Sequence, residues 1–270
     1  MKFGIGTYCT TWMIGVPNYP LPQHPLQILQ LLDIVHEYGL HLVQIADNFP
    51  LYSIDNKELL TISNKAEQLE ISIEIGLRGS DPIALLRYLE IAEIFHSSIV
   101  RTLLTHESLE MCKKELLEVL PKYEEAGVKL ALENHGLHAS GELAEFIRSF
   151  HSPVIGCCLD TVNSFGSLEG PEVVIDNLLL HTINLHLKDF IVKRHTHQMG
   201  FEIIGTPAGE GKLPIVSLIQ KIECLAKKNN RPAPTIILEN WVPWQGNIED
   251  TVVLEKQWLD KSIQYLKTLE

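Results

Sequence analysis

Four short apolar segments in the second half of the chain each carry a side chain that can bind a metal ion. The segment LALEN carries Glu133, GCCLD closes on Asp160, INLHLKD carries His186 and TIILEN carries Glu239. Three carboxylates and one imidazole form an oxygen-rich ligand set, which suits Mn²⁺, Mg²⁺ or Co²⁺ and suits Zn²⁺ less well. We therefore interpret these residues as an active site that binds one divalent cation, with Mn²⁺ as the expected ion.

The elements that must position these ligands alternate regularly along the chain. Short apolar runs indicate strands and longer amphipathic runs indicate helices, in eight consecutive βα units without a linker. This pattern predicts an α/β fold, a single (β/α)8 TIM barrel over residues 1–270, with a doubly wound open sheet as the alternative. The expected strands are 2–8, 41–46, 71–76, 98–104, 128–133, 154–160, 182–188 and 235–239. The expected helices are about 25–39, 56–70, 81–96, 107–126, 140–149, 171–180, 213–228 and 249–268.

Local signals support two helix boundaries and the place of the site. Asp81 and Pro82 form a typical N-terminal signal, and Gly127 stands just past the end of the helix 107–126. All four candidate ligands lie at the C-terminal ends of their expected strands. Alternate strand residues share a face, and barrel enzymes carry their active sites at this end, so the four side chains can meet there.

Two long loops, at about residues 9–25 and 189–212, are expected to act as lids. The first is rich in proline and aromatic residues from Trp12 to Pro25, so we expect no helix there. It is interpreted either as a rigid cover or as an apolar contact of Trp12 with substrate. The second loop carries glycines and positive charge, including Arg194 and His197, which could hold a carboxylate or a phosphate.

Other polar residues are expected around the mouth of the barrel. Lys188 shares a strand face with His186 and is predicted to point inward at an anionic substrate. His135 and Trp241 each lie two residues beyond a ligand and are expected in the pocket wall. In the first half of the chain, five residues are interpreted as generic polar residues of the mouth: Asp47, Asn48, Glu74, Arg78 and Arg101.

Composition restricts the class of partner. The net charge of −12 opposes nucleic-acid binding, which depends on Lys and Arg. No apolar run approaches the roughly 20 residues of a membrane helix, and the start MKFGIGTYCTTW does not resemble a signal peptide. We expect a cytoplasmic protein with a small, anionic carbohydrate substrate, and leave a homo-oligomer open. The five cysteines are interpreted as reduced thiols, with Cys158 as a small core residue.

The strand-terminal set LALEN, CLDT, HLKD and ILEN resembles the xylose isomerase-like TIM-barrel superfamily, the sugar phosphate isomerase/epimerase group, over essentially the whole chain. The resemblance implies metal ligation by Glu133, Asp160, His186 and Glu239, and proton transfer by the two glutamates. One departure is Asn163, which lies where the epimerases have a substrate-binding histidine. The departure weighs against simple ketohexose epimerisation, and the opening and long-loop sequences resemble a sub-branch in which we expect decarboxylases of 3-oxo sugar acids.

The expected reaction is isomerisation or epimerisation of a small sugar, sugar acid or sugar phosphate. A divalent cation would stabilise the enediolate, with Glu133 and Glu239 as base and acid. The alternative is metal-dependent decarboxylation of a 3-oxo sugar acid at the same site, with Lys188 or Arg194 holding the carboxylate. Two remote alternatives are a barrel like the abasic-site endonucleases, opposed by the acidic charge, and a non-catalytic metal-binding barrel, opposed by the complete ligand set.

Overall fold

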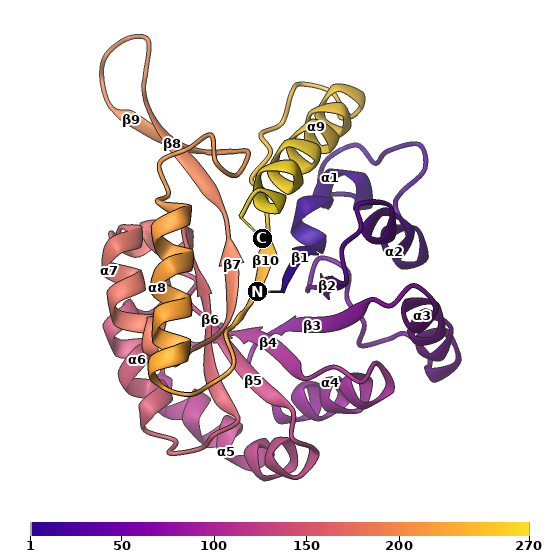
Figure 1. Cartoon of the computed structure of the whole chain (residues 1–270), viewed down its shortest axis with the longest axis vertical. Helices are drawn as coiled ribbons and strands as arrows, with labels where there is room; N and C mark the ends of the chain where they lie inside the picture. Colours follow the sequence, from indigo (N-terminus) through magenta and orange to yellow (C-terminus); the bar gives the residue numbers. More distant parts are fainter. Residues whose placement is uncertain (1, 270) are drawn as a thin grey trace.

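Eight parallel strands close into a barrel in the computed structural model, which describes residues 2–269 (Figure 1). Around the barrel the strands follow the order β1-β10-β7-β6-β5-β4-β3-β2. The predicted TIM barrel is therefore confirmed, and the open sheet is excluded. The barrel strands are β1 (Phe3–Gly6), β2 (Leu42–Ile45), β3 (Ser72–Arg78), β4 (Ile99–Leu103), β5 (Lys129–Glu133), β6 (Ile155–Asp160), β7 (Thr182–Leu187) and β10 (Thr235–Leu238).

Helices surround the barrel and lie close to the predicted positions. The largest difference is at the start of the first predicted helix, expected at about residue 25 and observed at Ile28. Within residues 2–269, no helix combines the length and the apolar character that a bilayer crossing demands. The helices of the outer ring are α2 (Ile28–Glu37), α3 (Asn56–Gln68), α4 (Pro82–Ile94), α5 (Leu109–Ala126), α6 (Ser140–Arg148), α7 (Pro171–Leu178), α8 (Ile215–Lys228) and α9 (Ile248–Lys267), and short 3-10 helices are η1 (Thr7–Cys9), η2 (Asn163–Ser167) and η3 (Leu179–His181).

The two predicted helix signals act as expected. The side chain of Asp81 accepts a hydrogen bond of 2.8 Å from the backbone N–H of Ala84, which caps the start of α4. Gly127 ends α5 with φ of 67°, in the left-handed region that glycine adopts without steric cost. Both signals depend only on neighbouring residues, so they can be recognised in the sequence.

The alternation along the strands separates core from site. In β5, Leu130 and Leu132 belong to the main apolar core between strands and helices, whereas Ala131 packs with Cys158 in a separate small cluster. Because side chains alternate between the two faces of a strand, Glu133 shares the face of Ala131. In β6, Asp160 shares the face of Cys158 for the same reason. The barrel interior therefore changes from apolar to polar toward its C-terminal end.

Both long loops contain regular structure. Residues 189–212 contain an antiparallel hairpin, β8 (Asp189–Arg194) and β9 (Phe201–Thr206), which extends past the helices at the upper left of Figure 1. In the first loop, the expectation of no helix is wrong for the short helix α1 (Thr11–Ile14). Its prolines begin only after this turn, and Glu255 of α9 accepts hydrogen bonds of 2.8 Å from the backbone N–H groups of Trp12 and Met13.

Candidate active site

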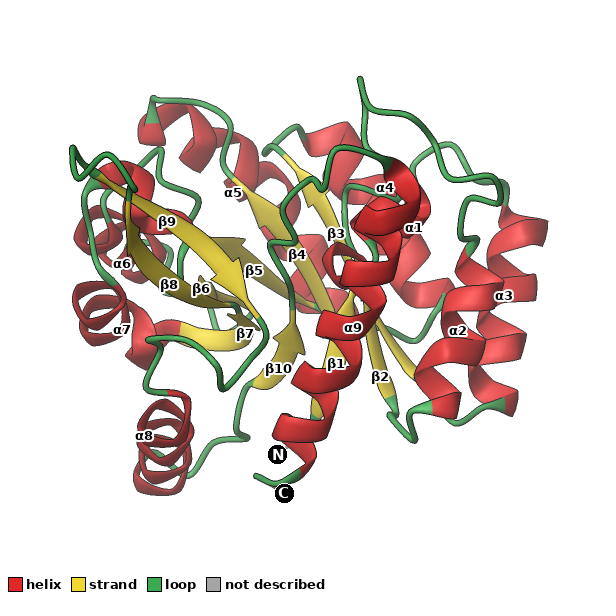
Figure 2. Ribbon diagram, turned by 90° about the horizontal axis from the view of Figure 1, so that it is seen from above, coloured by secondary structure: helices red, strands yellow, loops and turns green. Residues whose placement is uncertain are grey.

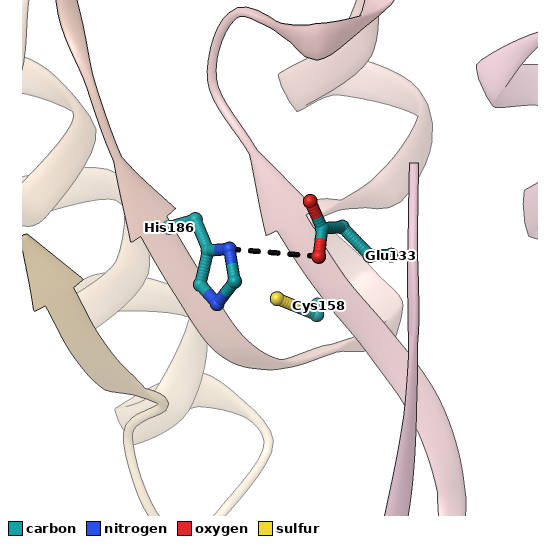
Figure 3. A group of neighbouring side chains, drawn as sticks. All are labelled: Glu133, Cys158 and His186. Atoms are coloured by element: carbon teal, nitrogen blue, oxygen red, sulfur yellow. Dashed lines mark ion pairs between the residues drawn. The ribbon is translucent and has the colours of Figure 1, made fainter. Parts of the chain in front are cut away.

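The four predicted ligands converge at the C-terminal end of the barrel. Glu133 ends β5, Asp160 ends β6, His186 lies in β7 and Glu239 directly follows β10, and all four side chains are buried. Nδ1 of His186 lies 3.6 Å from Oε2 of Glu133, 3.9 Å from Oδ2 of Asp160 and 3.4 Å from Oε1 of Glu239. Figure 3 shows the first of these contacts as a dashed line. The three carboxylates thus approach the same nitrogen of His186, and the ligand atoms of Asp160, His186 and Glu239 all lie within 4.8 Å of one another.

The imidazole of His186 is oriented by a polar layer below it. Nε2 of His186 lies 2.6 Å from Oε1 of Gln44. The amide nitrogen of Gln44 donates to Glu74 at 3.2 Å and to Asn184 at 3.1 Å, so the oxygen of Gln44 must face the imidazole. This arrangement favours a proton on Nε2 and leaves the lone pair of Nδ1 directed at the three carboxylates.

The unpartnered atoms of the cluster fit a bound cation. Oε2 of Glu133, Nδ1 of His186 and both carboxylate oxygens of Glu239 are buried and have no hydrogen-bond partner in residues 2–269. Bonds of about 2.1 Å to one ion place neighbouring ligand atoms about 3 to 3.5 Å apart, close to the distances observed here. Three buried carboxylates beside an imidazole are costly unless cations lie among them, and a divalent ion would add to the positive charge that Arg101 and Lys188 supply. The donor set therefore fits the predicted divalent ion.

Cys158 offers an alternative ligand beside Glu133 and His186 (Figure 3). Its Sγ donates a hydrogen bond to Oδ1 of Asn184 at 3.1 Å, which requires the protonated thiol. Burial, and then the negative charge of Glu133, raise the pKa of this thiol well above its usual value. Metal ligation needs the thiolate, so the geometry favours the oxygen and nitrogen ligands over this sulfur.

Glu133 is held by two neighbours in addition to His186. Nε of the fully buried Arg101 lies 2.6 Å from Oε2 of Glu133, in an ion pair whose N–H is not aligned on the oxygen. Asn163 donates a 2.8 Å hydrogen bond to Oε1. Burial alone would raise the pKa of Glu133, but Arg101 and then His186 lower it more, so this pKa lies well below its usual range. Glu133 is therefore a fixed carboxylate.

Arg101 connects the ligand cluster to the first half of the barrel. Its Nη1 lies 2.7 Å from Oδ1 of Asp47, whose other oxygen accepts a 3.1 Å hydrogen bond from Tyr8. The sequence interpretation of Arg101 as a generic residue of the mouth missed this contact with a ligand. A signal was present, since a charged residue inside the apolar strand IVRTL must be paired if it is buried.

Lys188 lies inside the cluster, as its position on the strand face predicted. Its Nζ lies 2.6 Å from Oδ2 of Asp160 and 2.8 Å from Oε2 of Glu239. Burial would lower the pKa of Lys188, but Asp160 and then Glu239 raise it more. The pKa therefore lies well above its usual range, and the group stays a charged ammonium. The ammonium of Lys188 therefore lies next to two of the predicted metal ligands, Asp160 and Glu239.

A cavity of about 380 Å³ opens above the ligands. This volume fits a small ligand such as a five- or six-carbon sugar acid. Trp12 forms one wall: its indole N–H donates to the carbonyl oxygen of Val242 at 2.9 Å, and its ring packs against Tyr19 and Trp244. The cavity is lined by Tyr8, Thr11, Trp12, Val16, Arg101, Leu103, Glu133, His135, Asn163, Lys188, Glu239, Asn240, Trp241, Val242 and Glu255.

Five of the predicted substrate-binding residues line this cavity, and two do not. Trp12, His135, Asn163, Lys188 and Trp241 contribute to its wall. Arg194 and His197 lie instead at the exposed end of the hairpin, which leads away from the mouth (Figure 2).

The reason for this correction is the pairing of β8 with β9. The guanidinium of Arg194 lies 4.3 Å from the ring of Phe201, directly across the hairpin, and donates to the carbonyl oxygen of Gln198. The ring of His197 stacks on that of His195. In a flexible lid these side chains could have folded over the cavity, but the paired strands hold them outside it.

Comparisons with known sequences agree with the barrel fold. A family model described as xylose isomerase-like TIM barrel matches residues 13–269. The chain is also 31% identical over 274 aligned residues to the 3-oxo-isoapionate decarboxylase of Pectobacterium atrosepticum. The alignment covers 99% of this chain and 96% of that protein.

Solved structures with low sequence identity share the fold. A D-psicose 3-epimerase, solved in the presence of D-fructose, is 14% identical with a TM-score of 0.69, over 99% of this chain and 98% of that chain. A xylose isomerase-like TIM barrel protein from Mycobacterium smegmatis, solved in complex with magnesium, is 13% identical with a TM-score of 0.67, over 98% and 96% of the two chains. At these identities the likeness concerns the barrel alone.

Proposed function

Because the chain belongs to the xylose isomerase-like TIM-barrel family, we propose that it is a divalent-metal-dependent enzyme that releases CO2 from a small 3-oxo sugar acid. Family relatives include a decarboxylase, an epimerase and a dehydratase, so an enzymatic role has broad support. Isomerisation or epimerisation was the first expectation from the sequence. The contacts of Glu133 with Arg101 and Asn163 favour the alternative reaction, decarboxylation.

The observation that carries the proposal is that Glu133 has one more polar neighbour than Glu239, whose partners besides His186 in residues 2–269 are limited to Lys188. Oε1 of Glu133 takes the amide hydrogen bond of Asn163, and its Oε2 lies against Arg101. Isomerisation and epimerisation require one proton to leave carbon and another to be delivered, in the expected scheme by a pair of glutamates on opposite sides of the substrate. Because Glu133 carries the additional hydrogen bond from Asn163, Glu239 is the glutamate that we assign to such transfer.

Decarboxylation of a 3-oxo acid needs less proton transfer. The bond between C1 and C2 breaks, its electron pair moves to the C2–C3 bond and the keto oxygen, and C1 leaves as CO2. One proton is then returned to C2. Glu239, whose Oε2 is paired with Lys188 at 2.8 Å and whose Oε1 accepts no hydrogen bond in residues 2–269, is the carboxyl group proposed to deliver it. A divalent cation at the four ligands supplies Lewis-acid stabilisation of the charge on the keto oxygen.

Two cations in the wall of the cavity also support an acidic substrate. Arg101 and Lys188 both line it, and both are almost fully buried. A cation in a site with little water interacts strongly with a carboxylate. The relative from Pectobacterium atrosepticum carries the name of a decarboxylase acting on a 3-oxo acid, which supports this class of substrate. The acid itself, Mn²⁺ as the ion, a cytoplasmic location and a homo-oligomer remain proposals.

The test is an assay in D2O with Mn²⁺, in which the purified protein is offered 3-oxo sugar acids and, separately, neutral ketoses and sugar phosphates. We expect CO2 and a ketose product carrying one deuterium at the carbon that lost the carboxylate. We expect no epimer from the neutral ketoses. Glu239→Gln should reduce CO2 release by about 10³-fold, while exchange of the exposed Glu125 for Gln should leave it unchanged. Deuterium exchange into ketoses without CO2 would instead support an isomerase or epimerase.

A further inference from the structure

Asp160 has only one oxygen to offer to a metal ion. Its Oδ1 accepts hydrogen bonds from the backbone N–H groups of Val162 and Asn163, at 2.9 and 2.8 Å. Its Oδ2 faces His186 and is already in contact with Nζ of Lys188 at 2.6 Å. Since Oδ1 is fixed by the backbone, a divalent cation at this site would approach Oδ2, the oxygen that contacts the ammonium of Lys188, and the two positive charges would repel each other.

Lys188 also has partners on the cavity side. Its Nζ donates a long hydrogen bond of 3.4 Å to Oδ1 of Asn163 and lies 5.8 Å from the ring centroid of Trp241. Both residues line the cavity in which the substrate is proposed to bind. An amide oxygen and an aromatic face both attract an ammonium group, so they can hold Nζ once it leaves Asp160.

We propose that Lys188 is an exchangeable occupant of the metal centre. When a divalent cation binds, the ammonium leaves Oδ2 of Asp160 and moves into the cavity toward Asn163 and Trp241, where it binds the carboxylate of the substrate. Metal loading thereby prepares the anion-binding position, and the acid binds after the metal. The competition for Asp160 depends only on the metal site, whereas the capture of a carboxylate rests on the proposed function.

The competition is tested by the affinity for Mn²⁺. Proteins freed of metal with a chelator are titrated with Mn²⁺ by calorimetry, comparing the wild type with Lys188→Met and, as a second variant, Lys188→Gln. Removing a positive charge about 4 Å from a divalent ion should tighten binding at least about tenfold. Lys193→Met is the matched control, because Lys193 is an exposed residue of the neighbouring hairpin, and its affinity should equal that of the wild type. Unchanged or weaker Mn²⁺ binding in both Lys188 variants overturns the proposal.

The capture of an anion is tested with D-xylonate, a five-carbon acid that lacks the 3-keto group, and with the neutral xylitol. In the wild type, Mn²⁺ should strengthen xylonate binding at least about tenfold more than xylitol binding. In Lys188→Met this advantage of xylonate should disappear, while the fold, followed by circular dichroism, is kept. An equal advantage in the variant contradicts the movement of Lys188 into the cavity.

The two proposals fail in different ways. If Lys188→Met binds Mn²⁺ more tightly but the wild type releases no CO2 from any 3-oxo acid, then the proposed reaction is wrong and the competition stands. If CO2 is released but the affinity for Mn²⁺ does not rise in the variants, the reaction stands and the exchange of Lys188 is refuted.

Discussion

The ends of β5 and β10 carry the same three residues, Leu-Glu-Asn, in opposite states. At the end of β5, the side chain of Asn134 donates to the carbonyl oxygen of Asp160 and to Ser164, and accepts from the backbone N–H of Asp160. At the end of β10, both amide atoms of Asn240 are buried without a partner in the described residues. The asparagine after β5 is therefore fixed by hydrogen bonds, whereas the asparagine after β10 has none among the described residues.

The two glutamates differ in the same way. Glu133 is held by Arg101 and Asn163. Among the residues that the structure describes, no hydrogen bond reaches Glu239, and Lys188 is its one ion-pair partner besides His186. The neighbouring strands explain this contrast. Strand β4 presents Arg101 beside β5, but β1 ends beside β10 at Gly6, which has no side chain to offer. The surroundings of each glutamate thus depend on the strand beside it.

The largest expected effect is the loss of turnover when Glu239 is replaced, compared with the replacement of Glu133. Glu239→Gln should reduce CO2 release by about 10³-fold, because it removes the carboxyl group proposed to return the proton. Its matched partner, Glu133→Gln, should reduce stability more than Glu239→Gln does, because it leaves the buried Arg101 facing an amide. Rates and thermal unfolding of both variants check this difference. Equal losses of stability in the two variants would contradict the conclusion that Glu133 is held more firmly than Glu239.

The next effect concerns the two arginines that contact Asp47. Arg101→Met should lower the free energy of unfolding by about 3 to 5 kcal/mol, since it leaves the buried carboxylate of Glu133 without its cationic partner. Arg78 also approaches Asp47, at 3.5 Å, but its side chain is half-exposed. Arg78→Met should therefore cost less than about 1 kcal/mol. Denaturant unfolding of the metal-free proteins measures both, and a similar cost for the two would show that the ion pair with Glu133 adds little.

A smaller effect distinguishes the two asparagines. Asn134→Ala removes three hydrogen bonds and should destabilise the protein by about 2 to 3 kcal/mol. Asn240→Ala removes none and should change stability by less than about 0.5 kcal/mol. Both are measured by thermal unfolding. A large loss for Asn240→Ala would mean that its amide has a partner, such as a bound water, and that the end of β10 is as fixed as that of β5.

The smallest effect tests the role of Gly6 beside Glu239. A Cβ at this position would lie 3.1 Å from Oε1 and 3.2 Å from Cγ of Glu239. Gly6→Ala should therefore displace the carboxylate and weaken Mn²⁺ binding by about tenfold, equal to about 1.4 kcal/mol. Gly166→Ala is a suitable control because a Cβ there meets no atom within 4 Å. Unchanged affinity in Gly6→Ala would show that Glu239 adapts without loss.

Local patterns in the sequence predicted the barrel well. Each expected strand and helix is present, because apolar periodicity and caps such as Asp81 and Gly127 depend on nearby residues. The hairpin was missed as regular structure, since it lies outside the barrel repeat and its strands have one exposed face. Arg194 and His197 were consequently expected near the substrate, although pairing of β8 with β9 holds them away.

The sequence alone determined the fold and the gathering of Glu133, Asp160, His186 and Glu239, because strand alternation in a closed barrel directs all four strand ends to one mouth. It could not determine which glutamate has fewer polar partners. That difference depends on Arg101 and Gly6, which lie far from Glu133 and Glu239 along the chain and meet them only when neighbouring strands pair. Tertiary structure decided it, because the availability of a buried carboxylate depends on the charges and hydrogen bonds that surround it.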